Sequence, residues 1–238
     1  MLKRLIDIFI SLVVIISCSP LIAAILFFVF LLTKEKPIFL QERKISLDKK
    51  EIKIIKIRTI RNSIQFLELK KLSQEIFFNK NYLMYVPSFC RWLRKTGLDE
   101  ILQVINVLKG EMSLVGPRPL LESDLIIMKR TNPECYYRRT KIDSKPGITG
   151  FWQVFGQRTK GIVNLVELDE KYDKNKSVLF DFKIIFRTLL ISLTASHSDS
   201  IVTETPKRAI CLVPNYKFDS EFSFGKKSFS LYYSQESD

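Results

Sequence analysis

The sequence predicts a mostly helical α/β fold, in which an N-terminal membrane segment precedes a small domain of amphipathic helices and a short sheet. Three observations predict it. Residues 5–32 are almost entirely apolar, apolar side chains recur at helical spacing after Lys95, and isoleucines alternate with cations between Ile52 and Arg58. A chain of 238 residues has room for one sizeable domain with appendages.

The apolar run is long enough to cross a membrane, but its middle is unusual. As a straight helix, residues 5–32 would reach about 42 Å, whereas a hydrocarbon core is about 30 Å thick. Ser19 and Pro20 stand at its centre, and proline removes a backbone hydrogen bond there. Lysine and arginine flank both ends, which favours the cytoplasmic side for each. A single span is the first interpretation, and a helix broken at Ser19-Pro20 that enters and leaves by one face is the alternative.

Two further features of this run bear on its environment. A signal peptide is disfavoured, because the run is too long and lacks a clear small-x-small cleavage site. Asp7 lies inside the apolar sequence, where a carboxylate in lipid needs a partner, and Arg4 is one helical turn away. We therefore expect Asp7 to pair with Arg4.

The charge of the chain predicts an anionic partner. The net charge is +13, and residues 195–238 hold five Lys/Arg against six Asp/Glu, so residues 1–194 carry +14. Nucleic acid, a phosphorylated substrate and an anionic membrane all fit this charge. Nucleic acid is disfavoured, because the sequence has no recognisable nucleic-acid-binding motif and no aromatic residues interleaved with the cations as a platform for base stacking. The four cysteines are far apart and the single histidine is His197, which disfavours zinc sites, disulfide frameworks and histidine triads.

The basic stretch 34–61 continues this pattern. It holds ten Lys/Arg and four Asp/Glu, and its alternation of Ile52, Ile54 and Ile57 with cations predicts a strand. The cations form a solvated face, a surface for lipid headgroups, or part of a site. Residues 63–93 suggest an amphipathic helix, for which the membrane interface and the core are equal alternatives.

The stretch 95–120 carries the strongest local pattern. Thr96 and Asp99 have the spacing of a capping box, and Gly110 stands where a C′ glycine would end the helix. Asp99 and Glu100 are then first-turn acids that complement the helix dipole. The apolar positions at helical spacing are Leu98, Ile101, Leu102, Ile105 and Leu108.

The next residues favour a second interpretation of that acidic pair. Pro117 and Pro119 flank Arg118 and restrict its backbone, which suits a guanidinium held in one place. An acidic pair near a locked arginine is consistent with phosphate chemistry, while the capping interpretation stays open.

The second half predicts two helices and a loop. Residues 121–129 and 180–193 have helical patterns, the second of them apolar and suited to packing or to a membrane. In the loop from Lys145 to Gly150, Gly147 and Gly150 either let backbone amides approach an anion or form an ordinary proline–glycine turn.

The stretch KTGLDEILQVINVLKGEMSLVGPRPL closely resembles the core signature of the bacterial sugar transferases, the monotopic polyprenyl-phosphate phosphoglycosyl transferases. Lys56-Ile-Arg-Thr, Lys145-Pro-Gly-Ile-Thr-Gly and Phe151-Trp-Gln-Val match further motifs of that family. The resemblance covers roughly residues 3–190. It shifts the membrane interpretation to a re-entrant helix hairpin over residues 1–36, followed by a catalytic domain over 37–194 and an extension of unknown role over 195–238.

The resemblance also implies an activity, namely transfer of a sugar-1-phosphate from a nucleotide sugar, expected to be UDP-linked, to undecaprenyl phosphate. Asp99 would be the catalytic nucleophile and Glu100 the ligand of a Mg²⁺ cofactor. The expected substrate-binding residues are Lys56, Arg58, Arg94, Arg118 and Gln153. The protein would lie on the cytoplasmic face of the bacterial inner membrane as a monotopic enzyme in contact with membrane lipids. Whether the protein forms a homodimer is left open.

Two departures from the family pattern leave an alternative function. Cys90 stands near an expected glycine, and Gln157 separates Gly156 from Arg158, where the family has Gly-Arg. A catalytically impaired membrane scaffold of a glycan assembly complex is therefore the second hypothesis.

Overall fold

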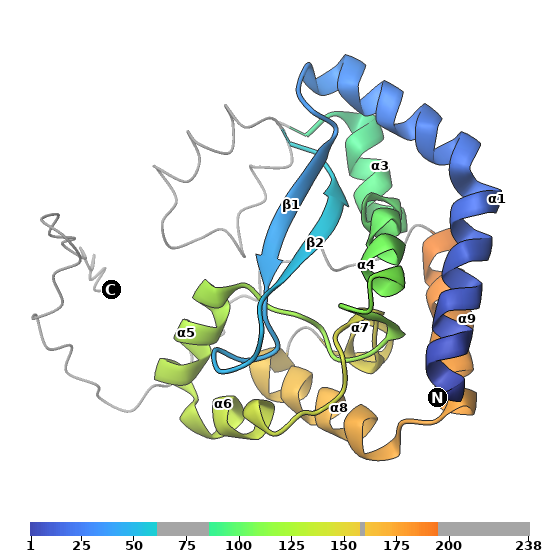
Figure 1. Cartoon of the computed structure of the whole chain (residues 1–238). Helices are drawn as coiled ribbons and strands as arrows, with labels where there is room; N and C mark the ends of the chain where they lie inside the picture. Colours follow the sequence, from blue (N-terminus) through green and yellow to red (C-terminus); the bar gives the residue numbers. More distant parts are fainter. Residues whose placement is uncertain (61–85, 158–159, 195–238) are drawn as a thin grey trace, which may run out of the picture. The chain divides into compact units, whose positions relative to one another are not determined.

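The computed structural model describes residues 1–60, 86–157 and 160–194 (Figure 1). The predicted fold class is confirmed, because long helices dominate and two short sheets accompany them. The predictions for residues 63–85, for Arg158 and for the extension 195–238 lie outside the described residues. The remaining elements after α1 (Leu2–Thr33) are β1 (Ile38–Arg43), β2 (Ile52–Ile57), α3 (Ser88–Thr96), η2 (Leu98–Gln103), α4 (Val104–Leu108), β3 (Ser113–Val115), α5 (Glu122–Thr131), α6 (Pro133–Thr140), β4 (Gly147–Thr149), α7 (Phe151–Phe155), α8 (Gly161–Asn175) and α9 (Val178–Leu193).

Helix α1 continues through the predicted break and bends between its two ends, as Figure 1 shows. Pro20 has no N–H to offer the carbonyl of Ile16, which is its partner four residues earlier. The hydroxyl of Ser19 donates to that same carbonyl over 3.0 Å. The serine therefore replaces the hydrogen bond that the proline removes, and the chain stays helical through Ser19-Pro20.

Within the described residues, α1 is the one helix long and apolar enough to cross a membrane. Most of its large apolar side chains are exposed, including Phe9, Ile16, Phe27 and Phe28. Exposed apolar side chains along a helix of this length indicate a membrane protein.

The first two turns of α1 are bound to the rest of the chain, and the predicted pair of Asp7 with Arg4 is wrong. Asp7 accepts hydrogen bonds from the Ser113 hydroxyl at 2.7 Å and the Leu114 amide at 3.3 Å. Arg4 instead donates to the carbonyls of Val107 and Leu108. Those carbonyls lie at the C-terminal end of α4, where the helix dipole is negative, so the arginine cation is stabilised there.

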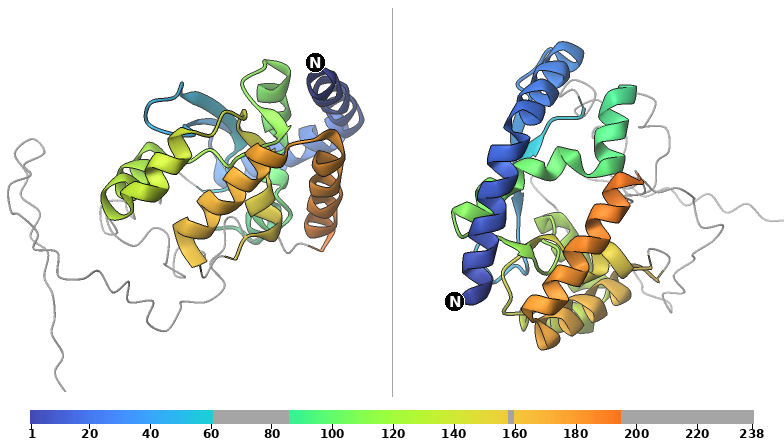
Figure 2. Two further views of the ribbon diagram at one scale, coloured as in Figure 1. Left: turned by 90° about the horizontal axis from the view of Figure 1, so that it is seen from below. Right: turned by 90° about the vertical axis from the view of Figure 1, so that its right-hand side faces the viewer.

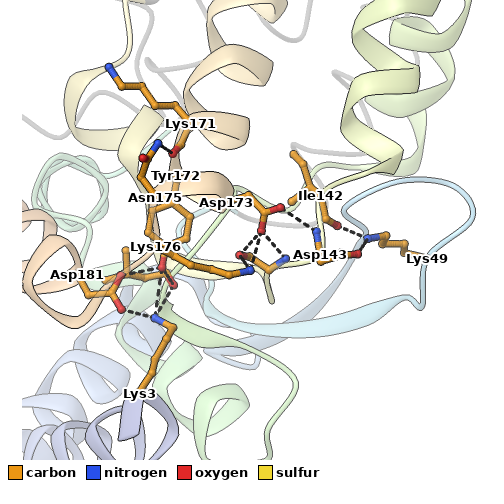
Figure 3. A network of polar contacts seen from close by, with 12 residues as sticks. Lys3, Lys49, Ile142, Asp143, Lys171, Tyr172, Asp173, Asn175, Lys176 and Asp181 are labelled. Atoms are coloured by element: carbon orange, nitrogen blue, oxygen red, sulfur yellow. Dashed lines mark hydrogen bonds and ion pairs between the residues drawn. The ribbon is translucent and has the colours of Figure 1, made fainter. Parts of the chain in front are cut away.

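Lys3 completes this anchor (Figure 3). Its ammonium group lies 2.5 Å from a carboxylate oxygen of Asp181 at the start of α9, and it also donates to the hydroxyl of Tyr172 and the carbonyl of Val115. Tyr172 donates to Asp181 over 2.7 Å. The first turns of α1 and α9 therefore lie next to each other, as the views in Figure 2 show.

The two sheets bring distant parts of the chain together. Strands β1 and β2 are antiparallel, with Arg43 opposite Ile52. The predicted strand is confirmed, because Ile52, Ile54 and Ile57 are buried and Lys53 is exposed. Strands β3 and β4 pair in parallel, so the predicted loop at Gly147 is largely a short strand.

The predicted helix over residues 96–110 is divided. Gly97 adopts a φ of 74° and ends α3, so Thr96 is the last residue of α3 and its hydroxyl donates back to Trp92 and Leu93. The capping-box prediction is therefore wrong, because the glycine ends one helix before the next begins. The prediction for Gly110 is confirmed. Its φ is 82°, and the amides of Gly110 and Glu111 bond to the carbonyls of Val107 and Asn106 in a Schellman arrangement.

The predicted helices of the second half are also present, as α5 and α9. Three groups of buried side chains hold these elements. One joins β2 and β3 to α8 and α9, a second joins α5, α6, α7 and α8, and a third joins the C-terminal half of α1 to β2, α3 and η2.

Candidate active site

A small cavity lies where β2, η2, β4 and α7 meet the segment after β3. Four of the predicted site residues line it, namely Lys56, Glu100, Arg118 and Gln153. They come from four parts of the sequence. The other lining residues are Arg43, Ile54, Gln103, Pro119, Gly147 and Ile148.

Lys56 and Glu100 form the closest charged pair of the cavity, with 2.5 Å between Nζ and Oε1. Both side chains are mostly buried, with 12% and 13% exposed. Asn106, which is fully buried, fixes their elements relative to each other. Its amide nitrogen donates to the carbonyl of Lys53 at 2.8 Å, and its oxygen accepts from the amide of Ile55 at 3.0 Å. One side chain of α4 thus holds β2 in the position that brings Lys56 to Glu100.

Asp99 precedes Glu100 in the first turn of η2, which continues directly into α4. Its side chain is 7% exposed. A carboxylate at this place lies at the positive end of the helical segment, which favours negative charge there. The acidic pair therefore lies at one helix start, as predicted, with Glu100 on the cavity wall.

Arg118 is the one residue between Met112 and Leu120 that is not buried. Its guanidinium lies 5.9 Å from the centre of the Trp152 ring. The backbone before it is held by β4. The amide of Gly116 donates to the carbonyl of Thr149, and the amide of Gly147 donates to the carbonyl of Pro117, each at a distance of 3.0 Å. The segment is thus packed on all sides except for the one cation that it presents.

The amide of Gly147 does not serve an anion, contrary to that interpretation of the glycine loop. It is bonded to the Pro117 carbonyl, and the absence of a side chain serves a different purpose. A Cβ atom on Gly147 would lie 2.1 Å from the backbone nitrogen of Gly116, and one on Gly150 would lie 2.3 Å from the Gly116 oxygen. These glycines let two backbone segments approach each other closely.

Arg58 and Arg94 are not among the residues that line the cavity. Arg58 donates to the carbonyl of Lys36 over 2.8 Å and lies 3.7 Å from a carboxylate oxygen of Glu35. Arg94 donates to the hydroxyl of Thr59 over 3.0 Å. Arg58 therefore lies against the connection between α1 and β1, and Arg94 lies against Thr59, two residues after the end of β2.

Arg43 and Gln103 belong to the cavity but were not predicted as site residues. A signal for Gln103 exists, because side chains three residues apart eclipse each other in a 3₁₀-helix and Gln103 is three residues after Glu100. A signal for Arg43 exists too, because the stretch PIFLQER that ends at Arg43 resembles the P-x-F-x-Q-x-R pattern of the bacterial sugar transferases. Gln153 lies on α7, where its amide nitrogen donates to Ile148 while its oxygen is buried without a hydrogen-bond partner.

Cys90, the departure from the family pattern, is a core residue of α3 with no exposed surface. Burial raises the pKa of its thiol to about 11, an effect that Arg94 opposes and Asp99 reinforces. An inert thiol packed against α1 and η2 changes the core and leaves the cavity wall unaltered.

The chemistry of the acidic pair fits a magnesium ion. Mg²⁺ keeps several waters and is held by one or two carboxylates together with substrate phosphates, so it needs no cage of protein ligands. Among the described residues no three His, Cys, Asp or Glu side chains gather. Glu100 and Asp99 are adjacent carboxylates, with Glu100 on the cavity wall, and can supply that smaller ligand set.

Comparison with known proteins places this site in context. The family described as bacterial sugar transferase matches residues 1–195, which confirms the resemblance predicted from the motifs. The exopolysaccharide production protein ExoY of Sinorhizobium fredii is 31% identical over 195 residues, covering 79% of this chain and 83% of that protein.

Two longer relatives carry names that describe a reaction. The UDP-glucose:undecaprenyl-phosphate glucose-1-phosphate transferase of Escherichia coli is 35% identical over 194 residues, covering 79% of this chain and 39% of that protein. The undecaprenyl-phosphate galactose phosphotransferase of Salmonella typhimurium is 31% identical over 201 residues, covering 81% of this chain and 40% of that protein. The chain therefore spans about two fifths of these two relatives.

Proposed function

The chain belongs to the bacterial sugar transferase family, and we propose that it transfers a sugar-1-phosphate from a nucleotide sugar to undecaprenyl phosphate, as the names of its relatives describe for them. The observation that carries the proposal is the cavity lined by Lys56, Arg43, Arg118 and Glu100, with Asp99 next to Glu100 at the start of η2. Three cations in one small cavity suit a diphosphate, and the adjacent carboxylates supply a nucleophile and a metal ligand.

The reaction proceeds in two displacements at phosphorus. A carboxylate oxygen of Asp99 attacks the phosphorus that bears the sugar, and the bond to the nucleoside monophosphate breaks, which leaves a phosphosugar on Asp99. An oxygen of undecaprenyl phosphate then attacks that phosphorus and releases Asp99, with the sugar now on a lipid diphosphate. Arg118 and Lys56 hold phosphate oxygens and lower the repulsion that an anionic nucleophile meets.

Glu100 would hold the Mg²⁺ ion, which supplies neutralisation of the diphosphate charge. Lys56 lies 2.5 Å from Glu100 and orients that carboxylate. Gln153 presents a buried amide oxygen at the same cavity, which suits a substrate hydroxyl group.

The membrane arrangement of this function is a re-entrant helix on the cytoplasmic face. Support comes from the two ends of α1. Lys3, Arg4 and Asp7 bind the domain at one end, and Ile25 and Val29 pack into its core at the other. A helix that crosses a bilayer separates its ends by the membrane, so it cannot bind one domain with both. Ser19-Pro20, near the middle of the apolar run, then lies at the deepest point in the lipid.

Purified protein in detergent, incubated with a panel of nucleotide sugars, tests the proposal. Intact-mass spectrometry of the wild type with one of these sugars should show a phosphosugar adduct, and addition of undecaprenyl phosphate should remove it. Asp99→Asn should fold and bind membranes but form no adduct, because a neutral amide does not attack phosphorus. Glu100→Gln should leave weak turnover that rises with added Mg²⁺.

The alternative of a catalytically impaired scaffold makes a different prediction in the same assay. No sugar of the panel would then form an adduct with the wild type, and Asp99→Asn would be indistinguishable from it. Normal turnover by Asp99→Asn would overturn the covalent mechanism.

A further inference from the structure

An ion pair deep in the second core group has contacts beyond those that packing requires. Arg139 of α6 and Asp169 of α8 lie 2.8 Å apart, with 0% and 1% of their side chains exposed. Burial raises the pKa of Asp169, and Arg139 opposes that rise. Moving two charges out of water is costly, and an apolar pair of similar volume is often as stable. The remaining contacts of Arg139 therefore need an explanation.

Those contacts lead to the cavity. The Nη2 atom of Arg139 donates to the carbonyl oxygen of Arg118, and its Nε atom donates to the carbonyl of Ile45 over 2.6 Å. Two residues before Ile45 is Arg43, the other arginine of the cavity wall. The two segments also exchange backbone hydrogen bonds between Lys44 and Leu120. One buried guanidinium thus joins the backbones that present both cavity arginines.

We infer that Arg139, held by Asp169, is a positioning residue that fixes the backbone of Arg118 so that its guanidinium meets the substrate phosphates. The inference rests on the proposed function and adds two residues to it. A planar guanidinium donates in three directions at once, here to a carboxylate and to two carbonyls. An ammonium group in its place keeps the charge, but its single nitrogen cannot span those three acceptors.

The neighbouring pair provides a matched control. Arg138 and Glu170 join the same two helices, with 2.7 Å between Nη2 and Oε2, and their side chains are 30% and 20% exposed. Among the described residues, the side-chain hydrogen bonds of Arg138 go to Glu170, whereas those of Arg139 also reach both cavity segments. A substitution of Arg138 therefore measures the effect of weakening the link between α6 and α8 without acting on Arg118.

The test is a double-substitution cycle on the full chain in detergent, with kcat and KM for the nucleotide sugar and the unfolding temperature as readouts. Arg139→Lys should lower kcat/KM at least tenfold, whereas Arg138→Lys should stay within about twofold of the wild type. In an Arg118→Ala background, Arg139→Lys should lower kcat/KM by less than about a further twofold, because a positioning residue acts through the group it positions. Asp169→Asn, which leaves Arg139 in place, serves in the same cycle if Arg139→Lys does not fold.

The outcomes separate this inference from the proposed function. Suppose that Arg118→Ala lowers kcat/KM, and that Arg139→Lys or Asp169→Asn lowers it by the same factor in the Arg118→Ala background as in the wild type. The positioning role is then overturned and the function stands. If Arg118→Ala leaves kcat/KM unchanged, the role of Arg118 in the proposed function is wrong and the inference goes with it.

Discussion

The close approach of β3 and β4 predicts that Gly147→Ala severely destabilises the protein. A Cβ atom on Gly147 would lie 2.1 Å from the nitrogen of Gly116 and 2.3 Å from the oxygen of Thr149. Favourable contacts between heavy atoms begin at about 3.5 Å, so the strands must separate by roughly 1 Å or more. Separation breaks the hydrogen bonds from Gly116 to Thr149 and from Gly147 to Pro117. At about 1–3 kcal/mol for each of the two buried amides left unsatisfied, the loss is roughly 2–6 kcal/mol.

Gly161→Ala is the matched control for this change. Gly161 has a φ of 58°, and nothing lies within 4 Å of an added Cβ atom. Only backbone strain of about 1–2 kcal/mol is then expected. Denaturant unfolding in detergent micelles measures both variants against the wild type. An unfolding free energy for Gly147→Ala equal to that of Gly161→Ala would refute the reasoning, because it would mean that the two strands have room for a side chain.

Three further predictions follow from single residues. Arg118→Lys keeps the charge but loses the planar fork, so turnover should fall at least about tenfold, or about 1.4 kcal/mol; near-normal turnover would make the guanidinium structural. Burial raises the pKa of Cys90 from 9.0 to about 11, so its thiolate fraction at pH 8 is about a hundredfold below that of an exposed cysteine, and rapid alkylation of the folded protein by iodoacetamide would contradict this. Cysteines introduced at positions 2 and 35 should react only from the cytoplasmic face, while Pro20→Leu should straighten α1 and move some molecules to a spanning orientation; periplasmic labelling of position 2 in the wild-type background would exclude the hairpin.

The elements that the sequence predicted correctly depend on local patterns. Alternation of Ile52, Ile54 and Ile57 is enough for β2, and Gly110 ends α4 because its left-handed conformation is a property of one residue. Thr96 was misassigned because its spacing to Asp99 is the same whether the helix begins or ends there. That choice is made by Gly97, whose conformation the spacing rule ignores.

The predictions that failed or were missing depend on partners far along the chain. Asp7 bonds to Ser113, more than a hundred residues away, and Gly147 bonds to the segment after β3. Lys56, Glu100, Arg118 and Gln153, which the motif resemblance predicted as site residues, line one cavity, because a motif carries long-range information that periodicity lacks.

Arg138 and Arg139 illustrate the same limit within two residues. They are identical and adjacent in sequence, yet one pairs with Glu170 near the surface and the other is fully buried against Asp169. A helix rotates about 100° per residue, so neighbours point to different surroundings. Only the packing of α6 against α8 decides which arginine is internal.

Lys3, Arg4 and Asp7 are anchored by residues that the ribosome makes much later. The partners of these residues lie between Val107 and Asp181, and at about 5–20 residues per second the ribosome needs roughly 9–35 s to pass from Asp7 to Asp181. The charged first turns of α1 therefore have no native partners while most of the domain is still being synthesised. The contact between Lys3 and Asp181 can form only after nearly the whole domain has emerged, so it is among the last contacts of the domain to become available.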